Sequence, residues 1–231
     1  MRIVVFGANG GTGRVLVRQA LTAGHEVVAV TRQPAAFPVT HDRLTVAGAD
    51  IGDSDLVARI VAGADAVLSS LGVPFSRKPI TVYSAGIASI ISAMSRHGVK
   101  RLVAVSSSAT EPSYHADGGF LLNRIVQPLV TATIGRTTYA DMRRMEQYLR
   151  EADLDWTVMR PSGLFDAPTV SAYQLHEDHA DGIFTSRTDL AASMLAQLDD
   201  RAWIGKFVAV TTYEGAPTLM QMMRREAFGS R

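Results

Sequence analysis

The chain has 231 residues, 47% hydrophobic and 19% charged, which is enough for one sizeable core and short for two full domains. It contains no cysteine, which excludes disulfides, thiolate metal sites and cysteine nucleophiles. The net charge is +1 without a basic block, and neither a signal peptide nor a long apolar span is apparent, so we expect a soluble, cytoplasmic protein without nucleic-acid or membrane partners.

Apolar runs typical of strands alternate with helical patterns along the chain. In the first run, RIVVFG at 2–7, the apolar residues are continuous rather than alternating, as expected where helices cover both faces of a parallel sheet. The expected strands are 2–7, 26–32, 43–50, 65–72, 100–108 and 155–161, and the expected helices are 12–23, 53–62, 81–97 and 138–152. This alternation predicts an α/β fold: one Rossmann-like domain over 1–231, with a doubly wound parallel sheet flanked by helices.

The stretch GANGGTGR, residues 7–14, lies between the first strand and the first helix. Unpaired backbone N–H groups at a helix start attract phosphate, and glycines let a pyrophosphate approach them. Gly7 is expected to make the turn, Gly10 to admit the pyrophosphate, and Gly13 to let the helix pack on the strand. The expected phosphate-binding residues are Gly7, Asn9, Gly10, Gly11, Thr12 and Gly13. The alternative is a glycine-rich turn with no ligand.

The end of the second strand indicates which dinucleotide is bound. An acidic residue there favours NAD, whereas an arginine accommodates the extra phosphate of NADP. The strand ends in Arg32, so NADP(H) is the expected cofactor; the alternative is a solvated surface arginine. After the third strand, Asp50 is expected to accept from the adenine amino group and Ile51 to pack beside the ring. Asp50 is also a candidate helix cap.

Several motifs together resemble one protein family over roughly residues 1–200. They are GANGGTGR, VTR, GADIGD, SSLG, LVAVSSS and EQYLREADLDWTVMRPSGLF, and they are similar to the atypical short-chain dehydrogenase/reductase proteins of the NmrA-like, NAD(P)H-binding group, biliverdin-IXβ reductase/flavin reductase in particular. The resemblance implies that Leu71 and Gly72 line the cofactor near its nicotinamide half. It also implies that Ser106 and Ser107 lie beneath the nicotinamide and that the stretch from Pro161 to Gly163 flanks it.

The chain departs from that family at its proton donor. Short-chain dehydrogenases typically use a Tyr, and a Lys four residues on, to protonate the product. Thr138 and Met142 occupy those positions here. Tyr139 and Arg143 have the right spacing one residue later, but a one-residue shift turns a helix face by about 100°. Ser107 and Tyr139 remain the candidate catalytic residues, and Tyr139 is also interpreted as a pocket-wall residue.

Three further stretches carry weaker hypotheses. Residues 109–137 are too long for a plain connection and are expected to form a substrate lid, or else a core helix or an oligomer contact. HEDH at 176–179 reads as a solvated loop rather than a metal site. Arg77 and Lys78 follow the fourth strand, where they are either an anion-attracting pair or an exposed basic loop.

Two classes of function fit these observations. The first is an NADPH-dependent reductase that transfers hydride to a small conjugated acceptor such as a flavin or quinone, a reaction that rests on placing the acceptor over the nicotinamide. The second is a non-catalytic NADP(H)-binding sensor or regulator of the NmrA type. A sugar-nucleotide epimerase is disfavoured by the missing Tyr-Lys pair and by the short stretch of chain after the sixth strand. A monomer or a homodimer is expected.

Overall fold

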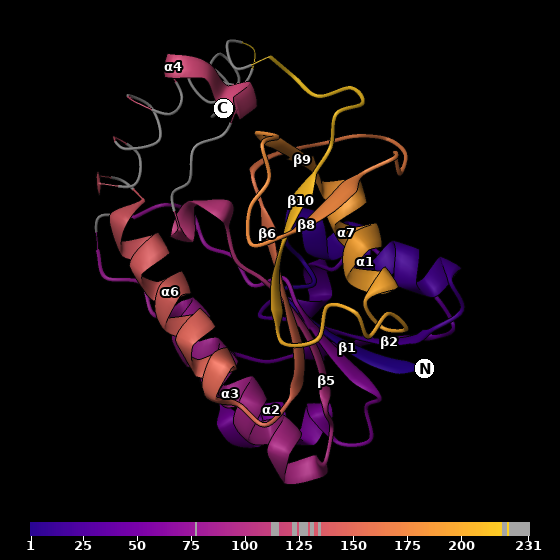
Figure 1. Cartoon of the computed structure of the whole chain (residues 1–231). Coiled ribbons are helices and arrows are strands. Elements are labelled where there is room, and N and C mark those ends of the chain that lie inside the picture. The colour runs from indigo at the N-terminus through magenta and orange to yellow at the C-terminus, as the bar shows by residue number, and fades with distance from the viewer. Residues whose placement is uncertain are drawn as a thin grey trace.

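The computed structural model describes residues 1–76, 78–111, 116–121, 124, 129, 132–133, 135–218 and 221. Eight strands form a sheet in the order β3-β2-β1-β4-β5-β6-β10-β8, parallel except for β8 at one edge (Figure 1). These strands are β1 Arg2–Phe6, β2 Glu26–Thr31, β3 Leu44–Gly48, β4 Ala66–Ser69, β5 Arg101–Val105, β6 Asp155–Pro161, β8 Gln174–Glu177 and β10 Lys206–Thr211. A parallel pair, β7 Gly163–Phe165 and β9 Phe184–Ser186, forms a second small sheet.

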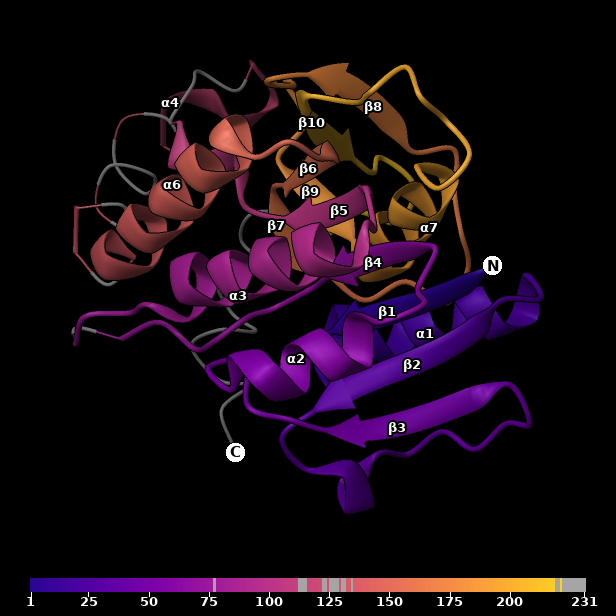
Figure 2. The same ribbon diagram turned by 90° about the horizontal axis from the view of Figure 1, so that it is seen from below.

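Helices cover both faces of the sheet (Figure 2). They are α1 Gly11–Thr22, α2 Ser54–Val61, α3 Val82–His97, α6 Arg136–Glu151 and α7 Arg187–Ala196, and a short further helix is α4 Gly119–Leu121. Along β1, Ile3 and Val5 pack with α1 and α7, whereas Val4 and Phe6 pack with α2, α3 and α6. Because both faces of β1 are buried, its apolar residues are consecutive rather than alternating. The arrangement confirms the predicted α/β fold.

The six predicted strands and four predicted helices are all present, with ends within three residues of those expected. The chain reverses its direction of strand addition between β1 and β4. At such a switch point the carboxyl ends of the strands leave room for a ligand. No helix within the described ranges is both long and apolar enough to cross a membrane.

The interpretation of residues 176–179 as a loop is wrong in its first half. His176 and Glu177 belong to β8, which pairs with the end of β10. The stretch looks like a loop because β8 is an edge strand whose side chains are mostly exposed, and Lys206 Nζ pairs with Glu177 Oε2 at 2.7 Å. Among the described residues no cluster of three or more potential metal ligands occurs.

The expected lid at 109–137 is described only in part. The 3₁₀ turn Ser108–Thr110, the turn Ala116–Gly118 and the short helix α4 lie within it, and α6 begins at Arg136. Residues 112–115, 122–123, 125–128, 130–131 and 134 lie outside the described residues, as does Arg77. The lid therefore stays a prediction. Lys78 is exposed in the loop between β4 and α3.

Candidate functional site

The glycine turn joins β1 to α1 and lies against the turn that follows β4. Gly7 has φ +73°, and a Cβ added there would lie 2.4 Å from the backbone oxygen of Ser70. A Cβ on Gly13 would lie 2.2 Å from the backbone oxygen of Gly7. Only glycine fits either position, because the obstacle is backbone in both cases. As expected, Gly7 makes the turn and Gly13 lets the helix pack closely on it.

The first turn of α1 is open to an anionic ligand. Gly10 precedes the helix with an extended backbone and provides no side-chain cap, and no acidic residue lies in the first turn. By contrast, Asp53 caps α2 and Ser186 caps α7 with their own side chains. A Cβ on Gly10 would meet one backbone oxygen, that of Gly7, at 3.3 Å. The first N–H groups of α1 therefore have no side-chain cap, a condition that phosphate binding at a helix start requires.

Two polar side chains flank this cradle. Asn9 Oδ1 accepts a hydrogen bond of 2.9 Å from Arg14 Nε, which orients the arginine beside the glycine turn. Thr12 is half-buried in the first helical turn. Gly11 is exposed, and a Cβ there would lie 2.9 Å from Nε of Arg187, a residue that the sequence did not single out.

The residues expected at the adenosine end follow β2 and β3. Arg32 is exposed directly after β2 and has no hydrogen-bond or ion-pair partner among the described residues. Asp50 Oδ1 accepts from the backbone N–H of Gly52 at 2.9 Å. The alternative role foreseen for Asp50 as a helix cap is wrong, because Asp53 caps α2 by accepting from the N–H of Leu56 at 3.0 Å.

Ile51 and Leu71 come together although 20 positions separate them. A Cβ on Gly86 of α3 would lie 2.7 Å from Leu71 Cδ1 and 3.1 Å from Ile51 Cγ1, so both side chains pack over this glycine. Both are half-buried against the core. Gly72, the next residue, is exposed and has open space around its Cα. This places an apolar surface beside the glycine turn, at the β1–β4 switch point.

Two neighbouring strands bring the residues expected at the nicotinamide together. Ser106 and Ser107 follow β5, and Pro161 ends β6. The Oγ of Ser106 is buried and has no hydrogen-bond partner among the described residues. The Oγ of Ser107 accepts from the N–H of Ala109 at 3.2 Å, which leaves its own hydrogen available for a ligand. Pro161 is buried at the end of β6. A buried orphan hydroxyl is the kind of group that a bound ligand satisfies.

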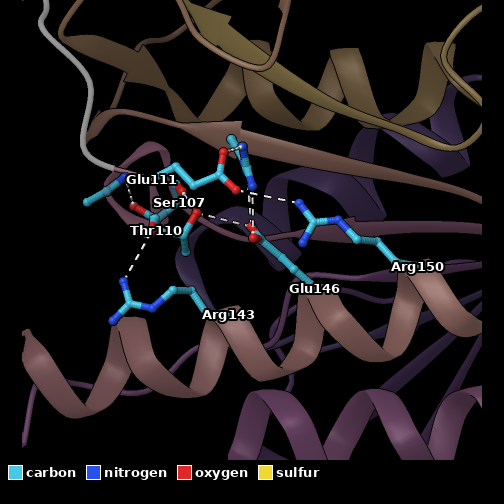
Figure 3. Close-up of polar contacts among 8 residues, drawn as sticks. Ser107, Thr110, Glu111, Arg143, Glu146 and Arg150 are labelled. Carbon is cyan, nitrogen blue, oxygen red and sulfur yellow. Dashed lines mark hydrogen bonds and ion pairs between the residues drawn. The ribbon is translucent and has the colours of Figure 1, made fainter.

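A buried ion pair between β6 and α6 lies next to the segment that carries Ser107 (Figure 3). Arg160 of β6 donates from Nε and Nη2 to the two carboxylate oxygens of Glu146 on α6, at 3.0 and 2.8 Å, and both side chains are 1% exposed. Its Nη1 donates to Glu111 at 3.0 Å. The guanidinium stacks over the ring of Phe207, 4.2 Å from its centre. Each nitrogen of this buried guanidinium therefore donates to a carboxylate, and one of its faces is covered by a ring.

The same network holds the segment that carries Ser107. Thr110 Oγ1 lies 2.8 Å from the backbone oxygen of Ser107 and 3.1 Å from Oε1 of Glu146. Arg143 donates to the backbone oxygen of Thr110 at 3.0 Å, and Arg150 reaches Glu111 at 3.5 Å. The segment after β5 is thus fixed from α6 (Figure 3).

The pKa values of Arg160 and Glu111 are shifted in the directions that favour their charged forms. Burial opposes the charged form of Arg160, but its hydrogen bonds to Glu146 and Glu111 outweigh this, and the pKa of Arg160 is raised. The hydrogen bond from Arg160 lowers the pKa of Glu111, in spite of partial burial. Both groups stay ionised around neutral pH, so the network acts as a fixed scaffold rather than as a proton donor.

The positions where the family has its Tyr and Lys are buried in α6. Thr138 and Met142 are 2% and 8% exposed, and Thr138 Oγ1 has no hydrogen-bond partner among the described residues. Tyr139 is also buried and packs edge-on against Phe75, with ring centres 5.9 Å apart. Arg143, one turn later, is held by the backbone oxygen of Thr110. Tyr139 is thus a buried packing residue, and its expected roles in catalysis or in a pocket wall stay predictions.

Sequence reasoning missed Glu146, Arg160, Thr110, Gly86 and Arg187. The ion pair joins residues on different elements, and no local pattern announces it. Arg187 is different, because it begins α7 directly after its cap, where Ser186 Oγ accepts from the N–H of Asp189 at 2.9 Å. The spacing of a serine and an acid three residues later is a recognisable helix start.

Curated relatives match this chain over different lengths. A uronate dehydrogenase of Pseudomonas syringae is 34% identical over 110 residues, which are 46% of this chain and 40% of that protein. The chain therefore spans less than half the length of that relative. An uncharacterized sugar epimerase of Bacillus subtilis, YhfK, is 27% identical over 208 residues, 87% of this chain and 89% of that protein.

Solved structures share the fold. A short-chain dehydrogenase/reductase of Veillonella parvula in complex with NADP superimposes with a TM-score of 0.77 at 20% identity, covering 92% of this chain and 95% of that one. ChuY, an anaerobillin reductase of Escherichia coli O157:H7, gives 0.71 at 20% identity, covering 94% and 100%. These likenesses show the α/β fold of a parallel sheet flanked by helices.

A family model described as NAD(P)H-binding matches residues 7–201. The matched region begins at Gly7 and includes the glycine turn, the β1–β4 switch point, the network around Arg160 and the start of α7. The chain belongs to this NAD(P)H-binding family.

Proposed function

We propose that the protein is an NADPH-dependent reductase that transfers hydride to a small conjugated acceptor such as a flavin or quinone. The observation that carries the proposal is the absence, at the two family positions in α6, of a side chain that can protonate the product: Thr138 and Met142 are buried there. An acceptor that delocalises the incoming electron pair takes its proton from water. Such a reaction asks the protein mainly for placement of the acceptor.

The residues of the chain fit a bound nicotinamide dinucleotide. The uncapped start of α1 would hold the pyrophosphate, the apolar surface of Ile51 and Leu71 would pack against the cofactor, and the orphan Oγ of Ser106 would gain a partner. When bound, the reduced nicotinamide supplies a hydride. Among the described residues the Oγ of Ser107 accepts one hydrogen bond and donates none, so it can donate one to the acceptor.

Large apolar side chains support a flat acceptor. Phe75, Phe120 and Tyr213 are exposed, and they lie in the segments that leave the carboxyl ends of β4, β5 and β10. Exposed aromatic groups at a ligand-binding edge favour a conjugated partner, because ring stacking adds to the gain from burial.

Steady-state oxidation of NADPH, followed by its absorbance with FMN or dichlorophenolindophenol as acceptor, tests the proposal. Turnover that depends on the acceptor supports a reductase. Tight NADPH binding without turnover on either acceptor would favour the second candidate, a non-catalytic NADP(H) sensor, which the missing Tyr-Lys pair also fits.

Cofactor preference should reside in Arg32. Its exposed guanidinium has no partner among the described residues, so it is free to pair with the additional phosphate of NADP. We expect the parent protein to bind NADPH about 10- to 100-fold more tightly than NADH, the worth of one charged hydrogen-bonded pair. Arg32→Asp should reverse this order. Calorimetric titration with both dinucleotides measures it, and equal affinities in the parent would contradict it.

Tyr139→Phe should lower turnover on flavin or quinone by less than the loss of a general acid would. Losing a general acid typically costs about 10²–10⁴-fold, whereas a pocket-wall tyrosine keeps most of its packing as phenylalanine. The measurement is the rate at saturating NADPH, with the melting temperature as a check on folding. A loss of the larger size in both Tyr139→Phe and Arg143→Ala would restore a shifted Tyr-Arg pair as the proton donor.

A further inference from the structure

Arg187 extends from the start of α7 to the glycine turn at the start of α1. The two helices pack together on one face of the sheet, and they lie side by side in Figure 1. A Cβ on Gly11 would lie 2.9 Å from Nε and 3.1 Å from Cδ of Arg187, so the guanidinium stem rests on the Cα of this glycine. Any other residue at position 11 would displace the arginine.

The charge of Arg187 is only partly matched within the protein. Its Nη1 donates to Oδ1 of Asp166 at 2.8 Å, and the Asp166 side chain is 81% exposed while that of Arg187 is 28% exposed. Nε and Nη2 have no hydrogen-bond partner among the described residues. A guanidinium has five N–H donors in a planar fork, so this one keeps donors for a further acceptor.

The surroundings favour an anion as that acceptor. The uncapped first turn of α1 and the side chain of Arg14 are both electropositive, and they share the glycine turn with Arg187. An arginine fixed beside two other positive groups gains most from a ligand with several negatively charged oxygens. The contact with Gly11 holds the guanidinium at the first residue of α1, beside these positive groups.

We propose that Arg187 is a cofactor-binding residue that donates hydrogen bonds to the pyrophosphate of the dinucleotide, and that Asp166 weakens this binding by competing for the same guanidinium. The proposal rests on the proposed NADP(H) binding and adds a residue from the far end of the chain to it. Arg32 would recognise the ribose phosphate, and Arg187 the pyrophosphate.

Three ligands separate the two arginines in calorimetric titrations. NADPH carries both phosphate groups, ADP-ribose carries only the pyrophosphate, and 2′-AMP carries only the ribose phosphate. Arg187→Ala should weaken NADPH and ADP-ribose about 10- to 100-fold and leave 2′-AMP unchanged. Arg187→Lys, which keeps the charge but not the fork, should lose less. Asp166→Asn should tighten NADPH and ADP-ribose, a result that a structural ion pair would not give.

The matched control is Arg201→Ala. Arg201 also pairs with an aspartate, Asp155 at 3.3 Å, but Asp155 lies at the amino end of β6, whereas the glycine turn follows the carboxyl end of β1. This variant should bind all three ligands as the parent does. Melting temperatures show whether each variant is folded.

Two failures are distinguishable. A folded parent protein that binds none of the three ligands would refute the proposed function itself. If the parent binds NADPH and Arg187→Ala binds it equally tightly, the role of Arg187 alone is refuted. The same follows if Arg187→Ala loses as much affinity for 2′-AMP as for NADPH. Weaker binding by Asp166→Asn would also refute it, because the ion pair would then serve only to hold α7.

Discussion

Glu146→Ala should lower the free energy of unfolding by about 3–5 kcal/mol, the usual cost of leaving one partner of a buried ion pair alone. Arg160 is 1% exposed and gives two of its hydrogen bonds to Glu146, so the variant leaves two buried N–H donors unpaired and Glu111 as the remaining carboxylate partner. Urea unfolding followed by circular dichroism measures the change. It is the largest stability effect that we expect from a single side chain outside the glycine turn.

Glu111→Ala is the matched comparison, because Glu111 also binds Arg160 but its side chain is 55% exposed. Exposed pairs contribute up to about 1 kcal/mol, so this variant should be far less destabilised. The double variant Glu146→Leu with Arg160→Met should recover much of the loss, since no charge is then left unpaired. If Glu146→Ala and Glu111→Ala cost the same, the buried pair does not support the fold as described.

Gly10→Val should weaken NADPH binding by about 100-fold or more while the protein stays folded. A branched side chain would cover the N–H groups at the start of α1, and losing two charge-assisted hydrogen bonds of about 1.5–3 kcal/mol each accounts for that factor. The fold should tolerate the change because Gly10 is exposed, has an extended backbone, and meets only one backbone oxygen, at 3.3 Å. Fluorescence titration with NADPH measures the affinity.

Gly13→Ala is the counterpart that damages the fold instead. Its Cβ would lie 2.2 Å from the backbone oxygen of Gly7, and overpacking of this kind typically costs about 1–3 kcal/mol. We therefore expect a lower melting temperature for Gly13→Ala and a near-parental one for Gly10→Val. Normal NADPH binding by Gly10→Val would show that the glycine turn is not the phosphate site.

The parts of the fold that the sequence predicts well are those encoded by neighbouring residues. β1 is readable from five consecutive residues with an apolar bias, and the glycines that follow it imply both a turn and a ligand. β10 was not predicted although KFVAVT is an apolar run of the same kind. β8 could not be read, because an edge strand with exposed side chains has the composition of a loop.

The candidate site divides in the same way. Gly7 and Gly13 have the local geometry that their motif predicts. The roles of Gly10 and Arg32 in binding are predictions that the variants above address, and the role of Ser107 stays a prediction. The bond between Glu146 and Arg160 and the contact of Arg187 with Gly11 arise from the packing of elements distant in the chain, and spacing along the sequence carries no record of them.

The contact between Gly7 and the backbone of Ser70 has a consequence for how the molecule assembles. The hydroxyl of Ser70 also lies 3.1 Å from the backbone oxygen of Phe6, across 64 positions of sequence. The first strand, turn and helix can form early because their contacts are local, but the turn acquires its final shape only when β4 pairs with β1. A fragment ending before β4 would lack the wall against which the turn rests, so competence to bind a dinucleotide should appear late in folding, after long-range strand pairing.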